Sequence, residues 1–145
     1  MKIAIGSDHG GIHLKSVLKD YLAEHQVEVQ DLGTYTEASC DYPDIAVTVC
    51  EAVLAGQAEK GILICGTGIG MSMAANKVKG IRAALCGDVF SAEMSRAHND
   101  ANVLCMGERV TGPGLAVRIL EAWLAGEFAG DRHTRRVDKI MALEK

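Results

Sequence analysis

Short apolar runs alternate with amphipathic stretches along the whole chain. The apolar runs have the length and composition of strands and fall at residues 2–5, 27–32, 61–65, 81–86 and 102–107. The stretches between them favour helices, at about 12–25, 43–56, 70–77, 88–98, 112–126 and, last, 133–143. Strands that alternate with helices favour a parallel sheet covered on both faces. The pattern therefore predicts an α/β protein: a three-layer α/β/α sandwich with a five-stranded, parallel, Rossmann-like sheet and a C-terminal helix.

Residues that typically begin helices support three of these boundaries. Pro43 suits a first helical turn, Asp88 is a good N-cap, and Gly112-Pro113-Gly114 opens the helix after the fifth strand. The chain has 145 residues, which suits one domain with a real core. No repeat, low-complexity tract or linker interrupts the pattern. We therefore expect residues 1–145 to form a single domain.

Composition and charge exclude several classes of protein. No apolar run approaches the roughly 20 residues that cross a bilayer, so we expect no membrane contact. The first residues, MKIAIGSDHGG, have too short an apolar part for a signal peptide. The net charge of −4 argues against general nucleic-acid binding. An anionic ligand would therefore need positive groups placed locally around it.

The cysteines and histidines indicate the compartment and argue against a metal centre. The chain has five cysteines, an odd number with no CxxC spacing, at positions 40, 50, 65, 86 and 105. This argues against a disulfide framework or a zinc knuckle and favours a reducing cytosol. Of the five histidines, only His9 and His13 are four residues apart, and one such pair alone does not make a metal site. We therefore expect a cytoplasmic protein that needs no metal and no other cofactor.

Polar residues follow three of the predicted strands at the point where each strand ends. Asp8 and His9 follow the first strand, Cys65 ends the third, and Arg109 follows the fifth. Ligands of open parallel sheets collect outside the carboxyl ends of the strands. We therefore expect these residues to share one rim of the sheet.

The loop after Cys65 carries glycines at 66, 68 and 70 but matches no familiar glycine signature. Met71 stands where a dinucleotide fingerprint has its last glycine, and no lysine follows in P-loop register. Met71 also stands where a tyrosine phosphatase loop would have arginine. The remaining feature is a glycine-rich backbone at the start of a helix. Its N–H groups stabilise oxyanions, and the same positive field lowers the pKa of a thiol. Cys65 is therefore either a reactive thiolate or a small strand-end residue packed against a helix, whereas Cys50, Cys86 and Cys105 are expected in the core.

Other candidate groups also have a structural alternative. Asp8 and His9 can bind a substrate, or Asp8 can form an Asx-turn and cap a helix. His98 and Asn99 end a predicted helix, where a histidine either serves as an acid–base group or interacts with the helix dipole. Tyr42 is either a hydroxyl donor or a loop anchor.

The last predicted helix combines a basic pair with an apolar stripe. Arg132 and Arg136 are four residues apart and project from one face, as a phosphate site requires, although most such pairs are only solvated. Val137, Ile140 and Met141 form the stripe. This helix can dock on its own sheet or on a partner subunit.

Six motifs together resemble the ribose-5-phosphate isomerase B family, which also includes galactose-6-phosphate isomerase subunits. They are SDHGG (7–11), DYPD (41–44), ICGTGIGMSMAANK (64–77), GIRAAL (80–85), SRAHNDANVL (95–104) and GDRHTRRV (130–137). The resemblance runs nearly from end to end. It implies a metal-independent aldose–ketose isomerase of the pentose phosphate pathway that interconverts ribose 5-phosphate and ribulose 5-phosphate.

The resemblance also implies a role for each candidate residue. Cys65 matches the catalytic base, and His98 matches the group that opens the furanose ring. Thr67 matches a residue that stabilises the enediolate together with the loop amides of Gly66, Gly68, Ile69 and Gly70. The glutamate that some members use as base would stand at Met71, so its absence assigns the base to Cys65. Sugar contacts fall to Asp8, His9, Tyr42 and Asn99, and phosphate contacts to Arg109, Arg132 and Arg136.

The resemblance further implies a homodimer or tetramer with an active site shared between subunits. In family members the neighbouring subunit lends the two arginines that match Arg132 and Arg136, so the C-terminal helix is expected to pack on the partner. Two alternatives stay open. The substrate can be a six-carbon sugar phosphate such as allose or galactose 6-phosphate, or the chain can be a non-catalytic nucleotide- or phosphate-binding module.

Overall fold

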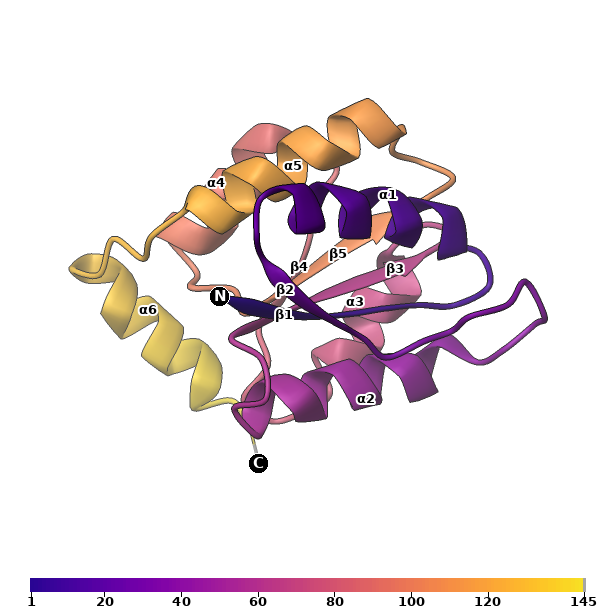
Figure 1. Cartoon of the computed structure of the whole chain (residues 1–145). Coiled ribbons are helices and arrows are strands. Elements are labelled where there is room, and N and C mark those ends of the chain that lie inside the picture. Colours follow the sequence, from indigo (N-terminus) through magenta and orange to yellow (C-terminus); the bar gives the residue numbers. More distant parts are fainter. Residues whose placement is uncertain (145) are drawn as a thin grey trace.

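The computed structural model describes residues 1–144, and within them the strands and helices follow the expected order (Figure 1). The strands are β1 (Lys2–Ser7), β2 (Glu28–Asp31), β3 (Lys60–Cys65), β4 (Ala83–Leu85) and β5 (Val103–Gly107). The helices are α1 (Ile12–Glu24), α2 (Tyr42–Leu54), α3 (Ile69–Ala75), α4 (Val89–Ala97), α5 (Pro113–Ala125) and α6 (Arg132–Met141).

The strands form one parallel sheet in the order β2-β1-β3-β5-β4. The first connection places β2 on one side of β1, and the next returns the chain to place β3 on the other side. This reversal between β1 and β3 is the kind of switch point where open α/β sheets bind ligands. In the register there, Ser7 pairs with Ile64.

Two apolar cores, one on each face of the sheet, make the three layers. Helices α1, α4 and α5 cover one face, and α2 and α3 cover the other (Figure 1). Side chains alternate along each strand, so Ile62 and Ile64 join the first core while Leu63 and Cys65 join the second. The predicted fold class is confirmed. The same alternation places the Cys65 side chain on the face that α2 and α3 cover.

The helix-start signals act as expected. Asp88 is the N-cap of α4, and its Oδ1 accepts the Ser91 N–H at 2.6 Å. Gly112 is the N-cap of α5, and Pro113 follows it in the first turn. Pro43 lies in the first turn of α2, which begins one residue earlier because Asp41 is its N-cap.

All five strands differ from the predicted ranges by one or more residues, and neighbouring contacts account for the differences at β1 and β4. β1 continues to Ser7, whose N–H donates to the Gly33 carbonyl at 2.7 Å. β4 was predicted over 81–86 but has three residues. Its start is shortened because the Asn102 side chain takes the Arg82 N–H, at 2.8 Å. An edge strand with a single partner has few other bonds to extend it.

The C-terminal helix α6 touches its own chain. Val137 is buried, and the Met141 sulfur accepts a hydrogen bond from Arg82 Nη1 at 3.3 Å. Beyond the helix, the Gly80 N–H donates to the Glu144 carboxylate at 2.8 Å. Ile140 remains 44% exposed. Packing of this helix on a partner subunit stays a prediction.

Among residues 1–144, no helix combines the length and the apolar character that crossing a bilayer demands.

Candidate active site

The candidate residues that follow β1, β3 and β5 lie at one rim of the sheet, as expected. These three strands are neighbours, and Cys65 pairs in register with Gly107, two residues before Arg109. The Asp8 N–H donates to the Ile64 carbonyl at 3.2 Å, and the Arg109 N–H donates to the Gly66 carbonyl at 3.0 Å. The loops after the three strands are therefore bonded directly to one another.

Cys65 lies between the second core and an open cleft. Its side chain is only 5% exposed, yet it lines a cleft of about 410 Å³. The cleft is lined by Asp8, Tyr42, Cys65, Gly66, Thr67, Ile69, Gly70 and Met73. Cys65 therefore packs in the second core, as its structural interpretation expects, and also contributes to the wall of the cleft. Its role as a reactive thiolate stays a prediction.

The glycine loop turns its backbone towards the sulfur. The Gly68 N–H donates to Cys65 Sγ at 3.1 Å, and this bond is buried. Gly68 can do so because its φ is +80°, a conformation that side-chain-bearing residues rarely adopt. The next amide, of Ile69, donates to Thr67 Oγ1 at 3.2 Å. The loop therefore supplies one donor to the sulfur and one to the threonine hydroxyl.

Two side chains from other elements close on this loop. The ring of Tyr42, at the start of α2, lies so close to Gly70 that a Cβ there would come within 2.6 Å of it. The Arg109 side chain lies across Gly66, where a Cβ would meet its Cδ at 3.5 Å. Glycine at 70 is needed for this close approach. α2 thereby brings Tyr42 to the cleft, and the segment after β5 places Arg109 against Gly66, which lines the cleft.

Asp8 also lines the cleft, and His9 follows it directly in the chain. Asp8 is 7% exposed, and its Oδ1 accepts the Gly10 N–H at 2.8 Å, so the Asx-turn is present. Asp8 does not cap α1, whose N-cap is Gly11. His9 Nδ1 accepts the Cys40 N–H at 3.3 Å. A ring nitrogen that accepts carries no proton, so this bond assigns the His9 proton to Nε2.

Four other candidate residues lie near the amino ends of the strands, opposite to the rim that carries Cys65. α4 begins after the carboxyl end of β4 and runs back, so His98 and Asn99 emerge near the amino ends of the strands. Arg132 and Arg136 lie on α6. The segment that leads into α6 is bonded to the end of α4, because the Ala129 N–H donates to the Ala97 carbonyl at 2.9 Å. These four residues do not meet Cys65 within one chain. For His98 and Asn99, the sequence motifs do not indicate this separation.

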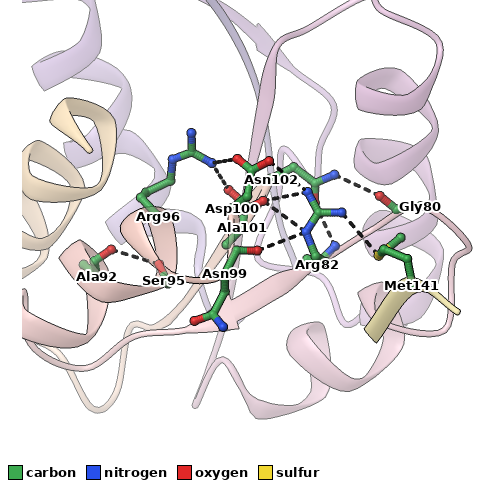
Figure 2. Close-up of polar contacts among 10 residues, drawn as sticks. All are labelled: Gly80, Arg82, Ala92, Ser95, Arg96, Asn99, Asp100, Ala101, Asn102 and Met141. Atoms are coloured by element: carbon green, nitrogen blue, oxygen red, sulfur yellow. Dashed lines mark hydrogen bonds and ion pairs between the residues drawn. The ribbon is translucent and has the colours of Figure 1, made fainter. Parts of the chain in front are cut away.

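The turn that carries Asn99 is held by two arginines (Figure 2). Arg82 Nε donates to the carbonyls of Asn99 and Asp100, both at 3.1 Å. Arg96 Nη1 donates to Asp100 Oδ1 at 3.0 Å and to the Ala101 carbonyl at 2.6 Å. Asp100 itself has φ +47°. A turn with this many charged donors on its carbonyls is fixed before any ligand binds.

His133 is a further candidate residue, which the sequence motifs did not single out. Its ring stacks on that of His98, with centroids 4.1 Å apart and 10° between the planes. Burial, the adjacent His98 and then the charges of Arg132 and Arg136 hold the pKa of His133 below its usual value. The available signal was its position between the two arginines on one helix, within the segment GDRHTRRV.

Comparison with known proteins identifies the family. Residues 3–140 match the Ribose/Galactose Isomerase family. The chain is 50% identical to ribose-5-phosphate isomerase B of Escherichia coli, over 99% of this chain and 97% of that protein. It is 46% identical to D-erythrulose-4-phosphate isomerase of Pectobacterium atrosepticum, over 97% and 93%. The solved structure of Clostridium thermocellum ribose-5-phosphate isomerase B has a TM-score of 0.98 and 55% identity, over 99% and 97% of the two chains. The chain belongs to the ribose/galactose isomerase family.

Proposed function

We propose that the protein is an aldose–ketose isomerase that interconverts ribose 5-phosphate and ribulose 5-phosphate, with Cys65 as the base. The observation that carries the proposal is the Gly68 N–H bond to Cys65 Sγ at 3.1 Å, in the wall of an open cleft. A backbone donor at this distance stabilises negative charge on sulfur. The relatives named as isomerases favour an enzyme over a non-catalytic binding module.

The reaction moves one carbon-bound proton. The Cys65 thiolate takes the proton from C2 of the open-chain aldose, the electron pair forms the C1–C2 double bond, and the C1 carbonyl oxygen becomes an anion. The proton then returns from sulfur to C1, while the C2 hydroxyl loses its proton and becomes the ketone carbonyl. The proton from that hydroxyl ends on the C1 oxygen. A positioned base of this kind contributes about 10²–10⁴-fold to the rate.

Thr67 is suited to stabilise the enediolate. Its Oγ1 accepts the Ile69 N–H at 3.2 Å, so its own O–H is left to donate towards the cleft. The amide of Gly66 belongs to the same loop and that of Gly70 to the first turn of α3, whereas the amide of Gly68 already donates to the sulfur. One donor aimed at a developing oxyanion is worth about 2.7–4 kcal/mol.

The remaining groups come from a second copy of the chain. Of the three candidate arginines, only Arg109 lies at the Cys65 rim, so the phosphate needs further cations there. A partner subunit that places the amino ends of its strands over this rim would supply His98 and Asn99 as well as Arg132 and Arg136. His98 then opens the sugar ring, and the arginines hold the phosphate.

Exposed apolar side chains around the cleft support this assembly. Ile69 is 51% and Met73 is 65% exposed, and both line the cleft. Leu85, 43% exposed, packs against Gly68. Apolar side chains gathered beside a polar site are typical of a surface that another protein covers. We infer a homodimer, or a tetramer built from such dimers.

The number of carbons in the sugar phosphate is the part of the proposal for which the relatives offer specific alternatives. The chain resembles a ribose-5-phosphate isomerase and a D-erythrulose-4-phosphate isomerase at 50% and 46% identity, so similarity alone does not separate their substrates. The family also includes galactose in its name. Four- and six-carbon sugar phosphates are therefore the alternatives.

The five free thiols support a reducing compartment such as the cytoplasm.

The test compares kcat/KM for four-, five- and six-carbon aldose phosphates in the wild type, Cys65→Ala and Cys50→Ala. Cys50 is a matched control because burial and then the charge of Glu51 raise the pKa of its thiol to about 11, so it stays protonated. We expect the largest kcat/KM for ribose 5-phosphate and a loss of about 10²–10⁴-fold in Cys65→Ala alone. Wild-type turnover by folded Cys65→Ala would exclude the assigned base, and a larger kcat/KM for another chain length would change the substrate.

A further inference from the structure

A buried ion cluster lies beside the rim, outside the residues assigned to substrate. Lys15 of α1 is 3% exposed, and its Nζ lies 2.8 Å from Asp31 Oδ1 at the end of β2. Lys19 Nζ lies 2.8 Å from the other carboxylate oxygen, and the Gly33 N–H donates to Oδ1 at 2.9 Å. Burial alone would raise the pKa of Asp31, but the bonds from Lys15, Lys19 and Gly33 lower it overall. Asp31 is therefore a carboxylate held among donors.

The two lysines differ in one respect. Lys15 Nζ also donates to the Thr34 carbonyl at 2.5 Å and lies 5.1 Å from the centre of the Tyr35 ring. The only bond described for Lys19 Nζ is to Asp31, and its side chain is 40% exposed. Lys15 therefore joins the carboxylate to the segment 33–41, which we call the β2–α2 loop, whereas Lys19 contacts only the carboxylate.

The β2–α2 loop depends on such polar anchors. Residues 35–39 are exposed and lie outside helices and strands, so little apolar burial holds them. At the loop's start, the Thr34 N–H donates to the Ser7 carbonyl at 2.6 Å, and the Tyr35 hydroxyl donates to the Asp31 carbonyl at 2.9 Å. In the middle, Glu37 pairs with His13 at 2.9 Å, an exposed contact of small energetic value. Lys15 adds the anchor that comes from a buried side chain.

The far end of this loop reaches the candidate active site. The Cys40 N–H donates to His9 Nδ1 at 3.3 Å, and Asp41 then caps α2, where Tyr42 packs on Gly70. The Cys40 bond decides which nitrogen of His9 carries the proton. With Nδ1 accepting, the Nε2–H is left as a donor for a sugar or phosphate oxygen.

We propose that Lys15 is a positioning residue that holds the β2–α2 loop so that the Cys40 amide keeps His9 in its Nε2–H tautomer. Lys15 touches no substrate; it acts through Thr34 and the loop. The substrate-binding consequence rests on the proposed function, because it needs a ligand that accepts from His9. The tautomer itself does not, so it can be measured in the protein without substrate.

The test compares Lys15→Met with Lys19→Met. Each removes one ammonium from the same carboxylate and leaves the other, but only Lys15→Met also removes a bond to the β2–α2 loop. The state of His9 is followed by ¹⁵N chemical shifts of the imidazole, which separate the two tautomers, in histidine-labelled protein. The affinity is followed by KM and kcat with ribose 5-phosphate. Thermal unfolding checks that both variants are folded.

We expect Lys19→Met to keep the wild-type tautomer and KM. Lys15→Met should show a mixture of His9 tautomers and a KM raised about 10-fold, the effect of weakening one hydrogen bond to a charged group, with kcat nearly unchanged. Cys40→Pro, which deletes the N–H donor, should reproduce both effects, and the double variant should add nothing further because the two changes break one connection.

Identical tautomers and KM values in folded Lys15→Met and Lys19→Met would overturn the proposal. If Lys15→Met does not fold, Lys15→Arg replaces it, and a changed or an unchanged tautomer and KM are interpreted in the same way. Arginine keeps a cation beside Asp31 but replaces the compact ammonium that reaches Thr34. If the wild type isomerises no sugar phosphate, the proposed function fails. The ¹⁵N comparison then still decides the positioning role.

Discussion

The rings of His98 and His133 stack with their centroids 4.1 Å apart near the amino ends of the strands, opposite to the rim that carries Cys65. Both belong to a preformed group: the Asn99 turn is fixed by Arg82 and Arg96, and α6 presents Arg132 and Arg136 beside it. The cleft around Cys65 is equally preformed, by the Gly68 bond and the Tyr42 contact. Under the proposed function, these two groups, one at each end of the strands, are the two halves of a site that two chains share.

Mixing two inactive variants tests whether these halves come from different subunits. Cys65→Ala damages one half and Arg136→Ala the other, so a mixed dimer contains one doubly damaged and one intact site. After subunit exchange of equal amounts, we expect about one quarter of the wild-type activity, because half of the dimers are mixed and half of their sites are intact. Steady-state assay before and after exchange, with exchange followed by native mass spectrometry, measures this. Proven exchange without recovered activity would contradict the shared site.

Gly68→Ala should weaken both the fold and the activity. A Cβ at this φ of +80° is strained, and it would lie 2.6 Å from Leu85 Cδ1 and 2.8 Å from the Met106 carbonyl carbon. We expect a loss of about 1–2 kcal/mol in the free energy of unfolding together with a reduced kcat, because the amide that faces Cys65 Sγ is moved. Urea unfolding and steady-state kinetics provide the two measurements.

Gly87→Ala is the control for that substitution, since a Cβ at Gly87 meets nothing within 4 Å and its φ is not positive. Equal kcat values for the two variants would show that the orientation of the Gly68 amide does not matter for turnover.

His98→Asn should affect a cyclic substrate more than an open-chain one. If His98 opens the furanose ring, its loss slows turnover of ribose 5-phosphate by about 10²-fold, while an aldose phosphate that cannot close this ring is much less affected. His25→Asn is the control, because the His25 ring contacts Tyr21 at the end of α1. The ratio of the two kcat/KM values is the measurement. The same loss on both substrates would remove the ring-opening role.

The Lys15–Asp31–Lys19 cluster predicts a pH dependence of stability. The pKa of Asp31 is lowered in the folded protein, so the unfolded chain binds its proton more tightly. The stabilisation from this group is therefore complete above the unfolded carboxyl pKa of about 3.9 and is lost as the pH falls below it, through the folded value. Urea unfolding of the wild type and Asp31→Asn between neutral and acidic pH should show a stability difference that shrinks below about pH 4. A difference independent of pH would show that Asp31 gains nothing from its charge.

Much of the fold could be predicted from the sequence because its signals are local. The strand GILIC, the Asp88 cap and Gly112-Pro113 act through neighbours within a few residues, and they predicted the order of elements and a sheet covered on both faces. The expected rim followed from the rule that parallel strands end together. Boundaries failed where a distant group decided them, as at β4, where the Asn102 side chain takes the Arg82 amide.

The sequence by itself determined the succession of strands and helices along the chain and the position of Cys65 at a strand end. Only the tertiary structure decided that β1 lies beside β3, that His98 and Asn99 lie at the opposite edge from Cys65, and that Lys15 connects Asp31 to the loop above His9. The physical reason is range. Periodicity and capping depend on adjacent residues, whereas strand order and ion clusters depend on which distant segments pack together, and no local pattern specifies that.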